Sequence, residues 1–149
     1  MLTSSDFKEL SNLLKKHKVR YLVVGGYAVM KYSEPRFTKD LDLLIDTSED
    51  NAKSVFLALK EFGAPLAHLT EKDFMSKDYF YQMGRPPMRI DVMMSIPGVE
   101  FEEAWKNKEF VNIGEVEVPF ISKPDLIKSK EASGRDEDLK DLKRLRSKE

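Results

Sequence analysis

The stretch from residue 22 to residue 46 limits the fold more than any other part of the chain. It begins as an apolar run that ends in Gly25-Gly26, and it closes with the segment DLDLLI at residues 40–45. Successive strand residues point to opposite faces, so Asp40 and Asp42 share one face, about 6–7 Å apart along the backbone. The leucines between and after them indicate a strand that is buried on its other face.

Two carboxylates on one face of a sheet repel each other unless a cation lies between them, and Mg²⁺ prefers carboxylate oxygen. A third acid, Asp91, stands between Ile90 and Val92, where a carboxylate must be paired, hydrogen-bonded or metal-bound. Arg89 is expected to point to the other face of that strand. Three strand-borne carboxylates fit a two-metal site for phosphoryl or nucleotidyl transfer. The alternatives are a solvated acid pair and a plain ion pair of Asp91.

The glycine pair that follows the first apolar strand has two interpretations. It is either a tight turn that needs no function, or a place where backbone amides at a helix N-terminus approach a phosphate. No Gly-Lys-Ser/Thr follows Gly25-Gly26, and the third glycine of the dinucleotide-binding fingerprint is missing. The pair therefore belongs neither to a Walker A loop nor to a Rossmann turn.

Length and composition bound the class of protein. The 149 residues, 41% hydrophobic and 34% charged, fit one domain over residues 1–149 with one core. A net charge of -1 gives no global field for nucleic acid, so any basic surface must be local. The absence of cysteine excludes disulfides, thiolate zinc sites and cysteine nucleophiles. The sequence shows no signal-peptide pattern and no long apolar run, so a cytoplasmic protein without membrane contact is expected.

Hydrophobic periodicity and turn residues predict alternating helices and strands, and hence a mixed, mostly antiparallel sheet flanked by helices, an α/β (α+β) fold. The last strand alternates acids and proline with apolar residues, which predicts an edge position. The expected strands are residues 21–24, 40–45, 79–83, 88–94, 109–113 and 115–121. The expected helices run from Ser5 or Asp6 to the basic run at 15–18, over 27–32, from Thr47 or Ser48 to Gly63, over 101–108, from Ser122 to Gly134, and on towards the C-terminus.

Three further expectations concern single side chains. In the last helix an inward stripe of Leu139, Leu142 and Leu145 is predicted. The acids of that helix alternate with basic residues, which predicts a solvated face rather than an RNA-binding one. His17 and His68 have no partner at ligand spacing and are expected at the surface. The charged residues of the predicted last helix are Asp138, Lys140, Asp141, Lys143, Arg144, Arg146, Lys148 and Glu149.

Taken together, three motifs resemble the nucleotidyltransferase superfamily that includes DNA polymerase beta. They are Gly25-Gly26, then Arg36-x-Thr38-x-Asp40-Leu41-Asp42-Leu43, then Ile90-Asp91-Val92. The variant found here looks most like two branches: small bacterial proteins akin to the AbiEii-type toxins of toxin–antitoxin systems, and the aminoglycoside and lincosamide nucleotidyltransferases. The resemblance covers a catalytic core at about residues 20–95, with C-terminal strands and helices at about 100–149.

The resemblance implies a nucleotidyltransferase fold and a role for each motif. Asp40 and Asp42 would hold two Mg²⁺ ions, with Mn²⁺ as a substitute, and Asp91 would complete the metal that aligns the acceptor hydroxyl. The amides of Gly25-Gly26 would hold a nucleoside triphosphate such as ATP. The acceptor attacks in line at the α-phosphorus and pyrophosphate leaves. Positioning and charge neutralisation would supply most of the rate.

Further phosphate contacts are expected outside the glycine turn. Many relatives have serine at the second glycine position, and Gly26 cannot donate a hydroxyl hydrogen bond. Arg36, Thr38 or Lys39 would substitute, Arg36 first because a guanidinium can clamp phosphate at two places. A solvated loop is the alternative. Lys130 resembles the lysine that contacts phosphate in AbiEii-like relatives; the alternative, a surface lysine near a helix end, is the interpretation favoured here.

The length of the chain gives the expectation for the acceptor. It is short for this superfamily and shows no large acceptor-recognition region, which favours a partner protein, a homodimer, or an acceptor that brings its own surface. A hydroxyl or phosphate of tRNA or of a protein fits that description, including in a toxin–antitoxin system. One alternative is a small antibiotic acceptor. The other is a catalytically idle binding or regulatory module, and the intact acid triad argues against this second alternative.

Overall fold

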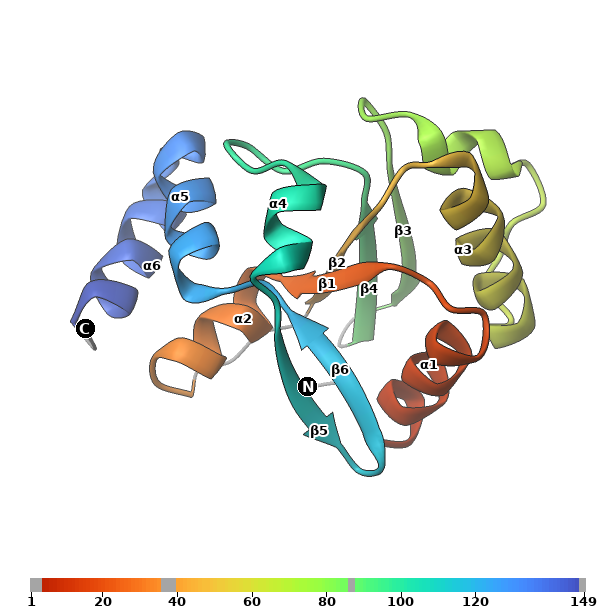
Figure 1. Cartoon of the computed structure of the whole chain (residues 1–149), viewed down its shortest axis with the longest axis horizontal. Coiled ribbons are helices and arrows are strands. Elements are labelled where there is room, and N and C mark those ends of the chain that lie inside the picture. The colour runs from red at the N-terminus through yellow and green to blue at the C-terminus, as the bar shows by residue number, and fades with distance from the viewer. Residues whose placement is uncertain (1–3, 36–39, 86–87, 148–149) are drawn as a thin grey trace.

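The computed structural model describes residues 4–35, 40–85 and 88–147, and all structural statements below refer to them. One six-stranded sheet, in the order β3-β4-β2-β1-β6-β5, runs through the molecule and is flanked by helices (Figure 1). The strands are β1 (Tyr21–Val24), β2 (Asp40–Ile45), β3 (Phe80–Arg85), β4 (Met88–Met93), β5 (Glu109–Ile113) and β6 (Val116–Phe120). The helices are α1 (Ser4–Lys16), α2 (Gly25–Tyr32), α3 (Glu49–Phe62), the 3-10 helix η1 (Glu71–Met75), α4 (Phe101–Lys106), α5 (Lys123–Ser133) and α6 (Asp136–Arg146).

The pairing of the strands confirms a mixed, mostly antiparallel sheet. β1 and β2 run antiparallel at its centre, and β3–β4 and β5–β6 are antiparallel pairs on the two sides. Two parallel pairs, β2–β4 and β1–β6, join these units. The parallel β2–β4 pair matters most for function, because it places residues of two segments far apart in sequence directly beside each other.

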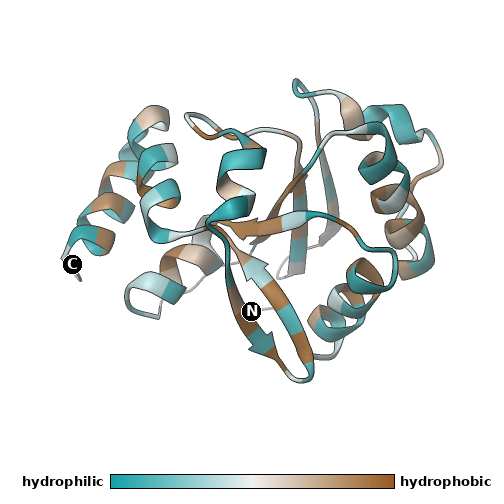
Figure 2. Ribbon diagram, viewed as in Figure 1, coloured by the Kyte–Doolittle hydropathy of each residue, from teal (hydrophilic) through white to brown (hydrophobic). Residues whose placement is uncertain are grey.

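The core lies between this sheet and its helices. All four residues of β1 are buried, as are Leu41, Leu43, Leu44 and Ile45 of β2, so the central strands are apolar on both faces. Figure 2 shows apolar residues concentrated on the central strands. α1 packs on α3, and α5 and α6 lie side by side at the opposite end of the molecule (Figure 1). Every described helix is too short or too polar to span a lipid bilayer.

Local signals set most boundaries. The Ser48 side chain accepts a hydrogen bond from the Asn51 amide at the start of α3, and Gly63 ends that helix with a positive φ of 94°. Several boundaries differ from expectation by one or two residues. α2 begins at Gly25 itself rather than at residue 27, and β3 ends at Arg85 rather than at residue 83. The helix therefore starts directly at the end of β1, with no intervening loop.

Two predictions about position in the fold are wrong. β6 is not an edge strand, since it lies between β1 and β5. β1 is short and pairs with it at Val23–Phe120, which leaves the rest of β6 paired on one side. Leu139 is 53% exposed, whereas Leu142 and Leu145 are buried as expected. The inward face of α6 is completed by acids instead.

Candidate active site

The three predicted strand acids lie on one face of neighbouring strands. Asp42 is the register partner of Asp91 across the parallel β2–β4 pair, and of Val24 across the antiparallel β1–β2 pair. Asp40 stands two residues before Asp42 on the same face and opposite Arg89. The topology thus brings together the three acids that the sequence singled out.

The glycine turn closes directly over Asp42. A Cβ added at Gly25 would lie 2.0 Å from Oδ2 of Asp42, and the φ of Gly25 is 67°. Only glycine fits there, because both the positive φ and the contact exclude a side chain. The first turn of α2 therefore meets the carboxylate of β2, as expected for a backbone that approaches a ligand at this point.

Burial and charge give Asp42 an unusual environment. Its Oδ1 atom is buried and has no hydrogen-bond partner among the described residues. Burial, followed by the charge of Asp91 and a hydrogen bond to it, raises the pKa of Asp42 to about 7. Asp40 acts in the same direction, whereas the Lys130 ammonium lowers it. A divalent cation would remove both the repulsion and the unsatisfied oxygen.

Asp91 is buried, with 8% of its surface exposed, and its Oδ1 accepts a hydrogen bond of 2.8 Å from Nε2 of Gln82 on β3. Among the described residues Asp91 forms no ion pair, which is the alternative expected for it. Arg89 does not point to the other face: residues two apart in a strand share a face, and Nε of Arg89 lies 3.9 Å from Oδ1 of Asp40. Gln82 was not identified from the sequence, because strand partners cannot be read from local patterns.

The carboxylate donors fit a metal ion, although the acids alone do not form a complete coordination sphere. Among the described residues, no group of three or more His, Cys, Asp or Glu side chains is arranged to hold an ion. Asp42 and Asp91 are the close pair, and Asp40 lies beside them at the edge of the site. Hard oxygen donors that repel one another, one of them unsatisfied, suit Mg²⁺ completed by phosphate oxygens and water.

A cavity of about 340 Å³ opens beside Asp42. Gly25 and Asp42 line one part of it, and Ser129, Lys130 and Ser133 of α5 line another. Apolar side chains from the end of β4, the loop after it and α5 complete the wall. An apolar cavity with a few polar groups and a carboxylate of raised pKa is typical of a ligand site.

Lys130 is not the surface lysine of the alternative interpretation, because its side chain is only 14% exposed. Its Nζ lies 3.2 Å from Oδ1 of Asp138 and 3.1 Å from Oδ2 of Asp141, both on α6. The expectation that these acids belong to a solvated face is wrong, since Asp138 is 1% and Asp141 3% exposed. Their spacing of three residues, in line with the buried Leu145, is the signal that could have found them.

The remaining predicted residues do not reach the site or lie outside the described part of the chain. Arg36, Thr38 and Lys39 fall outside it, so their roles stay predictions. His68 is exposed, and His17 lies within 3.2 Å of Glu61, far along the chain from the site acids. Gly26 is buried in the first turn of α2, next to Gly25.

Comparison with known proteins gives one family and a shared fold. A family model described as a nucleotidyltransferase of unknown function (DUF6036) matches residues 4–146. The search of curated proteins returned no match.

Three solved structures share the fold at low sequence identity. A lincosamide antibiotic adenylyltransferase, LnuA, bound to lincomycin, superposes with a TM-score of 0.61 at 17% identity, over 99% of both chains. TM1012, a candidate nucleotidyltransferase of Thermotoga maritima, gives 0.61 at 18% identity over 96% of this chain and 91% of that one. An antigenic nucleotidyltransferase-like protein from Paracoccidioides brasiliensis gives 0.56 at 16% identity over 93% and 71%.

Proposed function

Because this chain belongs to the nucleotidyltransferase family DUF6036, we propose that it moves a nucleoside monophosphate from a nucleoside triphosphate to an acceptor hydroxyl, with Mg²⁺ as cofactor. One observation carries the proposal. Asp42 lines a cavity and lies beside Asp91 on a parallel strand, and one buried oxygen of Asp42 has no partner in the described chain. A structural ion pair would have satisfied that oxygen.

The residues divide the work by position. Asp40, Asp42 and Asp91 would hold Mg²⁺, or Mn²⁺ in its place, and the ion supplies charge neutralisation at the triphosphate and the acceptor oxygen. The first amides of α2, at Gly25-Gly26, would donate to phosphate oxygens at the positive end of the helix dipole.

Lys130 would add a fixed positive charge from the α5 side of the cavity, which would attract the negative charge of a triphosphate. The apolar part of the wall would exclude water around the reacting groups. Most of the rate would then come from holding the triphosphate and the acceptor in line.

The acceptor has two candidate classes. A tRNA or protein hydroxyl follows from the expectation that a short chain needs an acceptor with its own surface. The structural comparison favours a small-molecule acceptor as the second candidate, because the lincosamide adenylyltransferase is matched over 99% of its length by 99% of this chain. A chain of this size is therefore large enough to carry an acceptor site of its own.

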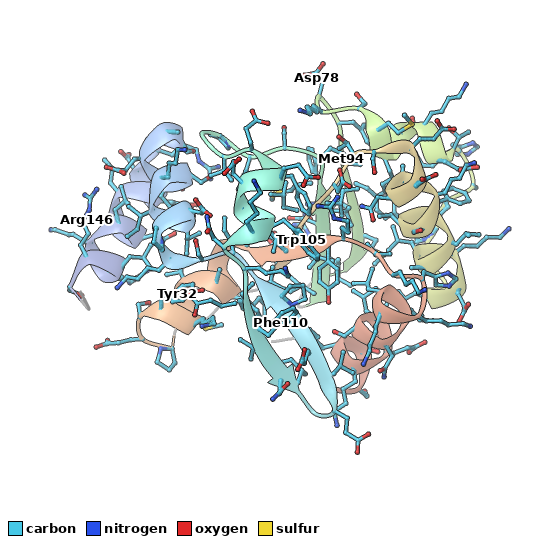
Figure 3. The ribbon with its side chains drawn as sticks, in the orientation of Figure 1. Tyr32, Asp78, Met94, Trp105, Phe110 and Arg146 are labelled. Atoms are coloured by element: carbon cyan, nitrogen blue, oxygen red, sulfur yellow. The ribbon has the colours of Figure 1, made fainter. Side chains whose placement is uncertain are left out.

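Transfer of label tests the function and separates the acceptors. The purified protein is incubated with each of four [α-³²P]nucleoside triphosphates and Mg²⁺, together with total tRNA, with no added acceptor, or with lincomycin or an aminoglycoside. We expect Mg²⁺-dependent label on one acceptor class, lost in Asp42→Asn and retained in Asp78→Asn, which removes an exposed acid at the outer edge of the molecule (Figure 3). Label that persists in Asp42→Asn would contradict the assignment of the site.

A further inference from the structure

A second group of buried charges lies between α5 and α6, next to the cavity. Lys130 extends from α5, and Asp138 and Asp141 approach it from the first two turns of α6. α5 and α6 pack side by side at one end of the molecule, with Arg146 at the outer end of α6 (Figures 1 and 3). Both carboxylates are within 3.2 Å of the same ammonium group.

Burial of the two carboxylates favours one position of the Lys130 side chain. A carboxylate that is almost fully buried is costly unless it is paired, and here two of them face one ammonium. Arg135 Nε donates to Oδ2 of Asp138 at 2.9 Å, and Arg144 approaches Asp141 at 3.4 Å, so each acid has a second cation on its outer side. The four-carbon stem of a free lysine samples many rotamers, and two fixed acceptors remove that freedom.

The held ammonium belongs to the cavity that Asp42 lines. Lys130 and Asp138 both contribute to its wall, and the charge of Lys130 acts on Asp42. Asp141 lies one turn further along α6 and is absent from the residues that line the cavity. The ion pair with Lys130 is the direct contact between Asp141 and a cavity-lining cation that the structure shows.

We propose that Asp138 and Asp141 are positioning residues, which fix the Lys130 ammonium at the cavity so that it meets the triphosphate of the bound nucleotide. The inference deepens the proposed function and rests on it. It makes α6, which carries none of the strand acids, a working part of the nucleotide site. Asp141 gives the cleaner test, because Asp138 also caps α6 by accepting from the Arg135 amide.

The test measures nucleotide affinity by isothermal titration with the α,β-methylene analogues of four nucleoside triphosphates in Mg²⁺. Asp141→Asn keeps the shape of the side chain and removes its charge. Glu131→Gln is the matched control, because it breaks the exposed Arg146–Glu131 pair between the same two helices and leaves Lys130 untouched. Thermal unfolding of each variant checks that the fold is retained.

We expect Asp141→Asn to weaken binding about tenfold, the loss of about one charge-assisted contact, while Glu131→Gln stays at the wild-type affinity. In a Lys130→Gln background, Asp141→Asn should have no further effect on affinity. If Lys130→Gln does not fold, the comparison of Asp141→Asn with Glu131→Gln decides alone.

The outcomes separate the two claims. Wild-type affinity in folded Asp141→Asn, or a further loss of the same size in the Lys130→Gln background, would overturn the positioning role and leave the proposed function standing. A wild-type protein that binds none of the four analogues would overturn both.

Discussion

Two groups of clustered aspartates in this molecule compensate the repulsion between their charges in different ways. The strand cluster lies on β2 and β4 and consists of Asp40, Asp42 and Asp91. The helix cluster lies between α5 and α6 and consists of Lys130, Asp138 and Asp141. In the helix cluster the chain supplies cations to both acids, whereas in the strand cluster Arg89 lies near Asp40 alone, Asp42 lies beside Asp91, and one buried oxygen of Asp42 has no hydrogen-bond partner among the described residues.

The pKa values of one acid in each cluster, Asp42 and Asp138, move in opposite directions. Burial and the neighbouring acids raise the pKa of Asp42 to about 7. Burial also acts to raise the pKa of Asp138, but hydrogen bonds led by that from Arg135 outweigh it and hold the pKa well below its usual range. Acids whose charge is compensated within the chain need no cation from outside, whereas an acid with a raised pKa and an unsatisfied oxygen is a candidate metal ligand.

The largest effect is expected from removing the cation of the helix cluster. Lys130→Met should lower the free energy of unfolding by about 3–5 kcal/mol, because it leaves two carboxylates buried without their ammonium. Urea unfolding followed by circular dichroism measures it. Lys128→Met is the control, since Lys128 is exposed on the same helix, and its effect should stay within about 0.5 kcal/mol. Equal effects for the two variants would mean that the helix cluster is not a stabilising ion-pair network.

The turn over the strand cluster should be the next most sensitive position. Gly25→Ala is expected to cost about 2–3 kcal/mol, because a Cβ there combines a positive φ with a clash against Asp42. Gly63→Ala is the matched control: its φ is 94°, but nothing lies within 4 Å of the added Cβ, so only the backbone cost of about 1 kcal/mol remains. The difference between the two variants in urea unfolding gives the cost of the contact with Asp42. Equal costs would mean that this contact does not restrict residue 25.

Removing a charge from the strand cluster should stabilise the fold, whereas removing one from the helix cluster should destabilise it. A raised folded-state pKa means that Asp42 stabilises the fold below its ordinary pKa of 3.8, and that this contribution is lost as pH rises through about 7. In EDTA at pH 8, Asp42→Asn should therefore be more stable than wild type by about 2 kcal/mol, and the gain should vanish near pH 4.

Thermal and urea unfolding across pH 4–8 would show this crossover, with Asp78→Asn as the control that keeps the wild-type profile. Added Mg²⁺ should reverse the order at pH 8 by stabilising wild type alone. A variant less stable than wild type at every pH in EDTA would mean that Asp42 has an internal counter-ion after all.

The smallest effect is expected at the surface of the same two helices. Glu131→Gln should change the free energy of unfolding by less than about 0.5 kcal/mol, because Glu131 and Arg146 are about half exposed and their attraction is screened by water. Urea unfolding checks it. A loss comparable to that of Lys130→Met would show that any ion pair between α5 and α6 matters equally, and the distinction between buried and exposed pairs would fail.

The strand cluster could be predicted from the sequence because its signals are local. Alternation along residues 40–45, a glycine pair after an apolar run and an acid between Ile90 and Val92 each follow from strand geometry and from the cost of burying a carboxylate. The register that places Asp42 beside Asp91 could not be predicted, since strand order depends on tertiary packing.

The helix cluster could not be predicted for a related reason. Acids and bases alternate in the last helix, and this composition alone predicts a solvated face for Asp138 and Asp141. Only the packing of α6 on α5 shows that both face Lys130. The same lack of tertiary information placed β6 at an edge and assigned Arg89 to the wrong face, although the two-residue period of a strand was enough to correct the latter.

The most direct test of the central claim is metal-dependent nucleotide binding at the strand cluster. Isothermal titration would be made with each of the four α,β-methylene nucleoside triphosphates, with and without Mg²⁺, on wild type and on Asp42→Asn. We predict that wild type binds at least one analogue and that this binding requires Mg²⁺. The binding should be lost in Asp42→Asn, while the variant stays folded. Binding that is equal with and without Mg²⁺, or unchanged in Asp42→Asn, would contradict it.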